Sequence, residues 1–154
     1  FEVRDRLTKL GLESFVKTTG GKGLHVAAPI APKLPWDTVK DFTKAIASSM
    51  AHDAPDRYLV TMAKKARGGK IFVDYLRNGY GATAVAAYSP RARSTAPVSM
   101  PIEWKELVPA LRSDHFHLDT AAARLSVLKR DPWAPMLKLR QSITAKMLKA
   151  VGVR

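Results

Sequence analysis

The chain has 154 residues, 46% of them hydrophobic, which is the size and composition of one globular domain with its own core. It contains no cysteine, so disulfide bonds and thiolate metal ligands are excluded, and no apolar run approaches the roughly 20 residues of a membrane helix. Lysine and arginine total 26 against 13 acidic residues, a net charge of +13. This excess favours a polyanionic partner, most often nucleic acid, over a surface that is merely well solvated.

The first elements follow from hydrophobic spacing and turn residues. Apolar residues at helical spacing predict a helix over residues 2–10. Residues 14–18 and 24–30 have the composition of strands, and the glycine-rich residues 20–23 between them predict a hairpin. A second apolar stripe predicts a helix from residue 35 to residue 54.

A second hairpin is predicted in the middle of the chain. Residues 70–76 and 83–88 are rich in strand-forming residues, and the pair Asn78-Gly79 between them is a strong turn signal. Helices are expected over the following ranges: 104–107, 120–130 and 135–151. Strands in antiparallel pairs mixed with helices predict the α+β class.

The loop of the first hairpin is a candidate anion site. Three glycines within four residues expose backbone N–H groups and permit positive φ, and a lysine and a threonine add a cation and a hydroxyl. His25 follows in the strand and shares a face with the small Ala27, which leaves room for a ligand. The alternative is an ordinary hairpin with a surface histidine. The loop residues are Thr19, Gly20, Gly21, Lys22 and Gly23.

The basic residues concentrate in residues 57–93, where Asp74 is the only acid. Such a lone carboxylate among cations suggests a site for phosphates and a metal. In the predicted strand Asp74 lies on the face of Phe72 and Leu76, where burial requires a compensating cation. A divalent metal or a structural pair with Arg77 can supply that charge. The basic residues of the span are Arg57, Lys64, Lys65, Arg67, Lys70, Arg77, Arg91 and Arg93.

Arg91 and Arg93 follow the second predicted hairpin. At i and i+2 they point the same way in an extended chain and can grip a triphosphate or a DNA backbone through forked hydrogen bonds. The alternative is a solvated basic loop.

Three segments in this order, TTGGKGLHV, KIFVDYLRN and YSPRAR followed by PIEW, resemble the polymerase module of bacterial ligase D, of the archaeo-eukaryotic primase superfamily. The segment Asp131-Pro132-Trp133 also resembles the C-terminal signature of that family. The resemblance covers nearly the whole chain. It implies a primase-polymerase fold with an RRM-like antiparallel or mixed sheet and flanking helices.

The resemblance also implies roles for single residues. His25 and Thr19, which stands where the family usually has serine, match positions at the nucleotide phosphates, and the glycines and Lys22 belong to the same loop. Asp74 matches the third carboxylate of a two-ion Mg²⁺ or Mn²⁺ site, and Arg77 follows it as in the family. Arg91 and Arg93 match arginines that line the active site. The basic positions expected near DNA are Arg67, which matches the family, with Lys64 and Lys65.

The family carries an Asp-x-Asp motif upstream, and this chain has none. We therefore expect residues 1–154 to be the C-terminal part of one primase-polymerase domain, with the N-terminal part missing and the fragment inactive by itself. Phe1, which no signal-peptide pattern follows, agrees with a chain that begins inside a longer protein or has been processed.

The function implied is addition of (ribo)nucleotides to a 3′-hydroxyl at double-strand breaks in bacterial non-homologous end joining. The implied partners are DNA ends, a nucleoside triphosphate (NTP or dNTP), ligase and nuclease domains of the same ATP-dependent ligase polypeptide, and a Ku-type end-binding protein. We expect the protein to be located in the cytoplasm, at the bacterial nucleoid, and to have no membrane partner. The alternatives are a stand-alone primase-polymerase and a non-catalytic nucleic-acid-binding domain.

Overall fold

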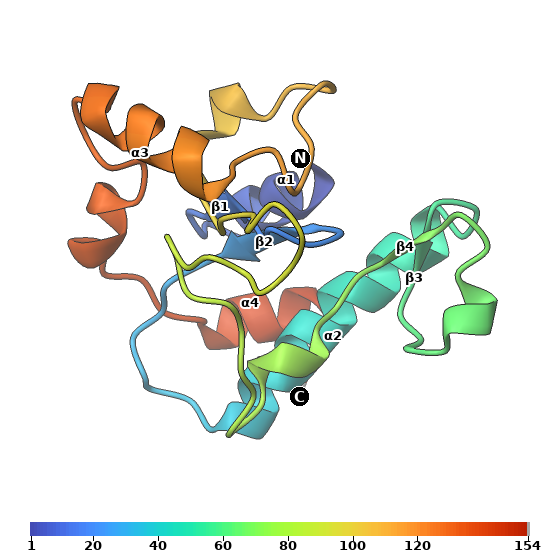
Figure 1. Cartoon of the computed structure of the whole chain (residues 1–154). Coiled ribbons are helices and arrows are strands. Elements are labelled where there is room, and N and C mark those ends of the chain that lie inside the picture. The colour runs from blue at the N-terminus through green and yellow to red at the C-terminus, as the bar shows by residue number, and fades with distance from the viewer. Residues whose placement is uncertain (154) are drawn as a thin grey trace. The chain divides into compact units, whose positions relative to one another are not determined.

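A computed structural model describes residues 1–153. The chain forms two compact units, each built from two stretches of sequence (Figure 1). The first unit contains Phe1–Pro29 and Val85–Gln141, and the second contains Ile30–Ala84 and the segment from Ser142 onward. Helices and a small antiparallel sheet confirm the α+β class. Within residues 1–153 no helix has the length and apolar character needed to cross a bilayer.

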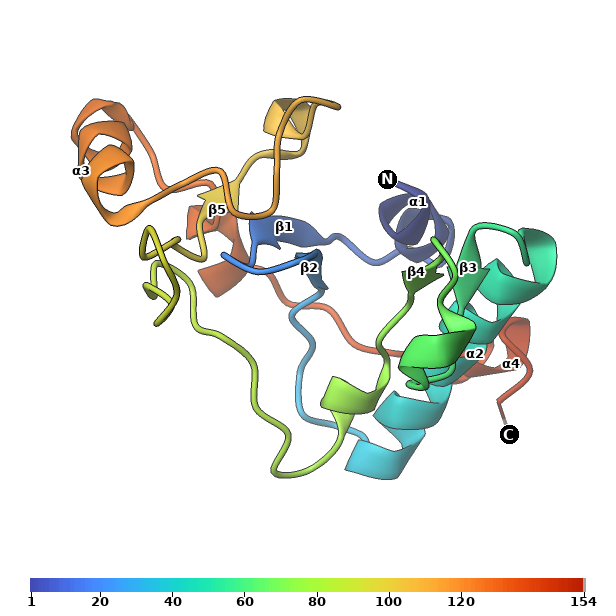
Figure 2. The same cartoon turned by 45° about the vertical axis from the view of Figure 1, so that its right-hand side comes forward.

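The first unit is organised around a three-stranded antiparallel sheet with the order β2-β1-β5 (Figure 2). Helix α1 spans Glu2–Lys9, and the strands are β1 (Phe15–Thr18), β2 (Leu24–Ala27) and β5 (Pro101–Ile102). The predicted first helix and first hairpin are therefore confirmed.

The core of the first unit lies against one face of β1. Val16 and Met100 are fully buried there, and they belong to one core cluster with the buried Ile102 and Phe116. Strand alternation sends Lys17, the next residue, to the other face. The shorter helices of this unit are the 3-10 turn η3 (Trp104–Glu106), the helix α3 (Leu118–Val127) and the 3-10 turn η4 (Ala134–Leu137).

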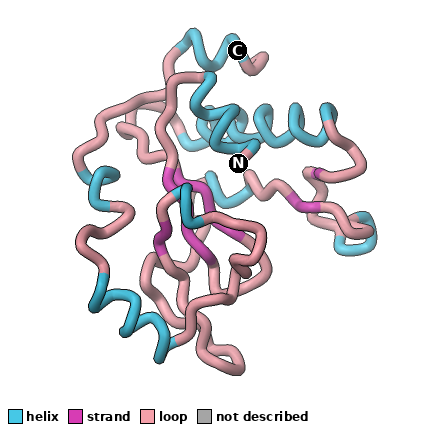
Figure 3. Tube along the Cα trace, turned by 90° about the horizontal axis from the view of Figure 1, so that it is seen from above, coloured by secondary structure: helices cyan, strands magenta, loops and turns pink. Residues whose placement is uncertain are grey.

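The second unit is built on helix α2 (Trp36–Asp53), as predicted, which buries Phe42, Ile46 and Met50. Strands β3 (Tyr58–Leu59) and β4 (Ile71–Phe72) form a short parallel pair. The 3-10 turns η1 (Lys64–Ala66) and η2 (Leu76–Asn78) and the helix α4 (Ala145–Ala150) complete the unit. Loops and turns make up much of the described chain (Figure 3).

The second predicted hairpin is wrong. Strand β4 ends at Phe72 and pairs with β3, and residues 83–88 form no strand. The chain turns before Asn78-Gly79, because the Asp74 carboxylate accepts a hydrogen bond from the Leu76 N–H at 3.1 Å. A short polar side chain that bonds the backbone locally competes in this way with strand pairing.

The two predicted C-terminal helices also differ from the structure. The expected helix over 135–151 is divided into η4 and α4, because the Thr144 hydroxyl accepts from the Met147 N–H at 3.3 Å and starts a new helix. The expected helix over 120–130 is α3, which begins two residues earlier, after His117, and ends at Val127. The 104–107 helix is present as η3.

Candidate functional site

The glycine-rich loop between β1 and β2 is held in one shape from two sides. From within, the Thr19 hydroxyl donates to the Gly23 carbonyl at 2.7 Å and accepts from the Gly21 N–H at 3.2 Å. From outside, the Ser113 hydroxyl donates to the Gly21 carbonyl at 2.7 Å, and the Gly20 N–H donates to the Ser113 carbonyl at 2.9 Å. The loop is thus preorganised rather than free to adapt.

Gly20 is where the loop and the arginine segment meet. Its φ is +62°, in the left-handed region that favours glycine, and a Cβ atom there would lie 2.9 Å from the Arg91 Cγ and 2.9 Å from the Pro97 carbonyl oxygen. The absence of a side chain at Gly20 therefore lets Arg91 pack directly on the loop.

Arg91 and Arg93 both lie beside this loop. The Arg91 guanidinium donates to the Thr19 carbonyl at 3.2 Å. A Cβ atom at Gly21 would be 3.8 Å from a terminal nitrogen of Arg93. The first unit thus brings together the loop, Arg91 and Arg93, as an anion site requires. Lys22 is exposed in the same loop.

His25 lies in β2 directly opposite Lys17 in β1. Side chains of a directly opposed antiparallel pair project from the same face of the sheet, with Cβ atoms about 5 Å apart. Ala27 shares this face, opposite Phe15. The His25 side chain therefore projects from the face of the sheet opposite the Val16 core, two residues after Gly23, the last residue of the loop.

Lys17 is a buried cation that was not predicted. Its side chain and backbone together are only 4% exposed, and its ammonium donates to the Val85 carbonyl at 2.5 Å and to the Ser99 hydroxyl at 2.6 Å. Burial, and secondarily the charge of Arg91, lower the pKa of the Lys17 amine to about 8.

The sequence alone did not identify three residues that contribute to this arrangement, namely Lys17, Ser99 and Ser113. Lys17 had a signal, because its position inside a predicted strand places it opposite His25 once the hairpin register is known. Ser99 and Ser113 had none. They reach β1 and the loop from 82 and 92 residues away in sequence.

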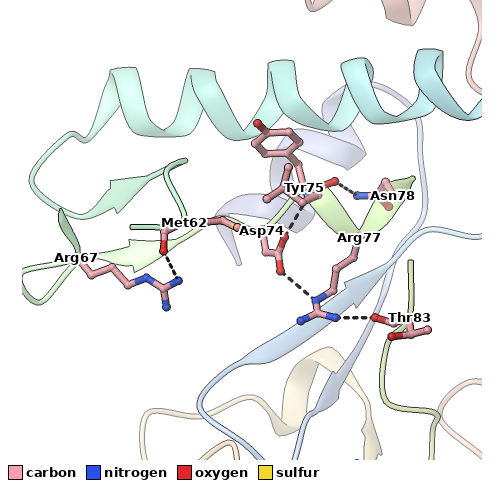
Figure 4. A network of polar contacts seen from close by, with 8 residues as sticks. Met62, Arg67, Asp74, Tyr75, Arg77, Asn78 and Thr83 are labelled. Carbon is pink, nitrogen blue, oxygen red and sulfur yellow. Dashed lines mark hydrogen bonds and ion pairs between the residues drawn. The ribbon is translucent and has the colours of Figure 1, made fainter. Parts of the chain in front are cut away.

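Asp74 belongs to the second unit, in the turn after β4 (Figure 4). The expectation that it shares a strand face with Phe72 and Leu76 is wrong, because β4 ends at Phe72. Its side chain is 33% exposed and forms an ion pair with Arg77, with 3.1 Å between Oδ2 and Nε. Arg77 also donates to the Thr83 carbonyl at 2.6 Å. The Asp–Arg pair that the sequence left open is therefore formed.

The basic residues expected near DNA, Arg67, Lys64 and Lys65, lie in the segment between β3 and β4 of the second unit. Arg67 donates to the Met62 carbonyl at 3.1 Å (Figure 4), and its guanidinium lies 4.9 Å from the centre of the Phe72 ring. Lys64 and Lys65 are exposed in η1. Their ammonium groups face solvent and are accessible to a polyanion.

A metal site is not formed by the described residues alone. Over residues 1–153 no group of three His, Cys, Asp or Glu side chains is placed to hold an ion. Both oxygens of Asp74 already accept hydrogen bonds, from the Leu76 N–H and from Arg77. A single carboxylate in this state does not satisfy the six oxygen ligands of Mg²⁺.

Comparison with known proteins links this geometry to one family. The sequence model described as "LigD, primase-polymerase domain" matches residues 1–133. A multifunctional non-homologous end joining protein LigD of Pseudomonas aeruginosa is 44% identical over 147 residues, which is 95% of this chain and 18% of the relative. The LigD of Mycolicibacterium smegmatis is 34% identical over 80% of this chain and 16% of its own length.

A solved structure is also similar. It is the polymerase domain from Mycobacterium tuberculosis ligase D in complex with DNA, with a TM-score of 0.75 and 35% sequence identity. The likeness covers 81% of this chain and 43% of that one. The chain therefore spans under half of the solved domain and about a fifth of the curated relatives it matches.

Proposed function

This chain belongs to the LigD primase-polymerase domain family, and we propose that it is the C-terminal part of one such domain, acting as a nucleotidyltransferase. The domain would add ribo- or deoxyribonucleotides to a 3′-hydroxyl at double-strand breaks during bacterial non-homologous end joining. It would do so beside ligase and nuclease domains of the same polypeptide. In the cytoplasm, at the nucleoid, its partners would be DNA ends and a Ku-type end-binding protein.

One observation carries the proposal: the packing of Arg91 onto the preorganised glycine loop at Gly20. A rigid loop with adjacent guanidinium groups suits the phosphates of a nucleoside triphosphate, because forked donors match phosphate oxygens. We assign the phosphates to the loop from Thr19 to Lys22, with His25, Arg91 and Arg93. In each case the residue binds and orients the substrate.

In the second unit we assign Arg77, Arg67, Lys64 and Lys65 to nucleotide or DNA phosphates, and Asp74 to one carboxylate of a divalent-ion site. The divalent ions of the family, when bound, stabilise charge that develops during phosphoryl transfer. The residues described here do not hold such an ion by themselves, so no step is assigned to it. Other carboxylates must come from outside this chain, and the fragment alone should be inactive.

The test is primer extension and ATP binding by the full-length protein and its His25→Ala variant. Loss of one charge-assisted hydrogen bond, about 1.5–3 kcal/mol, should reduce ATP affinity and nucleotide addition about tenfold or more. His52→Ala is a matched control, since His52 is exposed at the end of α2 in the second unit. Wild-type kinetics in His25→Ala would show that this histidine is not part of the site.

A further inference from the structure

The environment of Lys17 is unusual for a buried cation. Its ammonium contacts only the Val85 carbonyl and the Ser99 hydroxyl, both uncharged, and no carboxylate among residues 1–153 forms an ion pair with it. An ammonium has three hydrogens to donate, and these two acceptors use two of them. A positive charge, and one donor, are therefore left without compensation inside the first unit.

The position of Lys17 connects this charge with the proposed site. It is paired across the sheet with His25, so both side chains project from the same face. Two residues later on the same strand comes Thr19, whose hydroxyl organises the glycine loop and whose carbonyl accepts from Arg91. Three cationic or ionisable groups, Lys17, His25 and Arg91, thus border one edge of the loop.

Fold stability does not account for a lysine at this position. Burying a charge without a counter-ion is unfavourable, and an apolar side chain of similar length would fill the same space without that cost. The two hydrogen bonds go to uncharged acceptors, so neither partner brings a negative charge that would balance the ammonium. An anion that binds on this face would supply the missing opposite charge.

We propose that Lys17 is a positioning residue of the nucleotide site, whose ammonium, anchored by Ser99 and Val85, acts as a fixed counter-charge for the triphosphate. This inference rests on the proposed function. It adds to the loop and arginine contacts a buried charge, which salt screens less than an exposed one. Its anchors also join β1 to the segments that precede and follow Arg91.

The test replaces Lys17 by Met in the full-length protein and measures binding of ATP, ADP and AMP by calorimetry, with thermal unfolding of the same preparations. The variant should unfold at the wild-type temperature or above it, because an uncompensated charge has been removed. Its ATP affinity should fall at least about tenfold. The loss should be largest for ATP and smallest for AMP, in the order of ligand charge.

Lys129→Met is the control for overall charge, since Lys129 is exposed in the same unit. It should bind all three nucleotides as the wild type does. Equal ATP affinity in wild type and Lys17→Met, or an equal loss for ATP and AMP, would overturn the assignment. Unfolding of Lys17→Met at a much lower temperature would overturn it too, because Lys17 would then be a structural residue. If the wild type itself binds no ATP, the proposed function fails as well.

A second measurement compares the wild-type protein with Lys17→Met. Because the pKa of the Lys17 amine is lowered to about 8, part of the population is neutral at pH 8. An anion bound nearby raises that pKa, so ATP binding at pH 8 should take up a fraction of a proton. The titratable and charged groups that face Lys17 are His25 and Arg91, so the uptake assigned to Lys17 is the part that the Lys17→Met variant loses. Calorimetry in two buffers of different ionisation enthalpy detects the uptake, and its absence contradicts the proposal.

Discussion

At the scale of single residues, the candidate phosphate-binding side chains of the first unit pack closely against the backbone of the glycine-rich loop. Gly20 permits Arg91 to reach the Thr19 carbonyl, and Ser113 holds the loop from the other side. These contacts are formed in the structure without a bound substrate, so the side chains do not have to be ordered when the substrate binds. Preorganisation of this kind lowers the conformational cost of binding an anion.

Gly20→Ala should therefore damage both stability and binding. The left-handed φ of +62° costs a non-glycine residue about 1–2 kcal/mol, and the Cβ contacts at 2.9 Å with Arg91 and the Pro97 carbonyl add to that. We expect at least about 1 kcal/mol lower unfolding free energy in chemical denaturation, with weaker ATP binding in the same protein.

Gly23→Ala is the matched control for this loop. Gly23 has no heavy atom within 4 Å of the position of a Cβ. Its substitution should change the unfolding free energy by less than about 0.5 kcal/mol. A Gly20→Ala variant as stable as Gly23→Ala would show that the loop relaxes without cost, and that Arg91 is not held by it.

At the scale of elements, the region after β4 shows how one side chain decides between a strand and a turn. Asp74 accepts from the Leu76 N–H and pairs with Arg77, which in turn holds the Thr83 carbonyl (Figure 4). These bonds close the turn η2 and order the segment that follows it. The carboxylate is consequently presented on a turn, where it is partly exposed.

Asp74→Asn separates a reactive role from a structural one. The pair with Arg77 has side chains 33% and 56% exposed, so breaking it should lower the unfolding free energy by less than about 1 kcal/mol. Asn also retains an oxygen to accept from the Leu76 N–H. If Asp74 is a metal ligand, the full-length variant should keep its thermal stability and DNA binding but lose nearly all nucleotide addition.

Asp56→Asn is the control, because it removes an exposed acid from the same unit. It should leave primer extension unchanged. A stable Asp74→Asn protein with wild-type extension would contradict the metal assignment, and a strongly destabilised one would show that the turn depends on the charge.

At the scale of the whole molecule, the net charge of +13 dominates the expected interaction with DNA. Arg77 forms an ion pair with Asp74. Lys64 and Lys65 are exposed in η1, and neither forms an ion pair with another residue among residues 1–153. Contacts from such lysines to phosphates release counter-ions and carry no base information.

DNA affinity should therefore fall linearly with salt on a double-logarithmic scale. Each phosphate contact contributes a slope of about −0.9 on duplex DNA, so Lys64→Ala with Lys65→Ala should reduce the slope by up to about 2. Fluorescence anisotropy of labelled DNA between roughly 50 and 200 mM salt measures it. Lys105→Ala is the control, because Lys105 is already paired with Glu103 at 2.6 Å. Binding that is indifferent to salt contradicts this prediction.

The amino-acid sequence by itself determined the features that depend on neighbours along the chain. Helices α1 and α2 follow from apolar spacing, and the β1–β2 hairpin follows from strand alternation around a glycine-rich turn. The ordered segments around His25, Asp74 and Arg91 were sufficient to identify the family, and the fold class followed with it.

Only the tertiary structure decided the rest. The predicted hairpin around Asn78-Gly79 does not form, because β4 pairs in parallel with β3 and the Asp74 carboxylate stabilises an earlier turn. The pairing of β4 with β3 involves residues outside the predicted hairpin. Lys17 became a buried cation, and Ser113 a support of the loop, through partners 68 to 92 residues away. Hydrogen bonds over such separations depend on how distant segments pack, and spacing along the chain does not encode them.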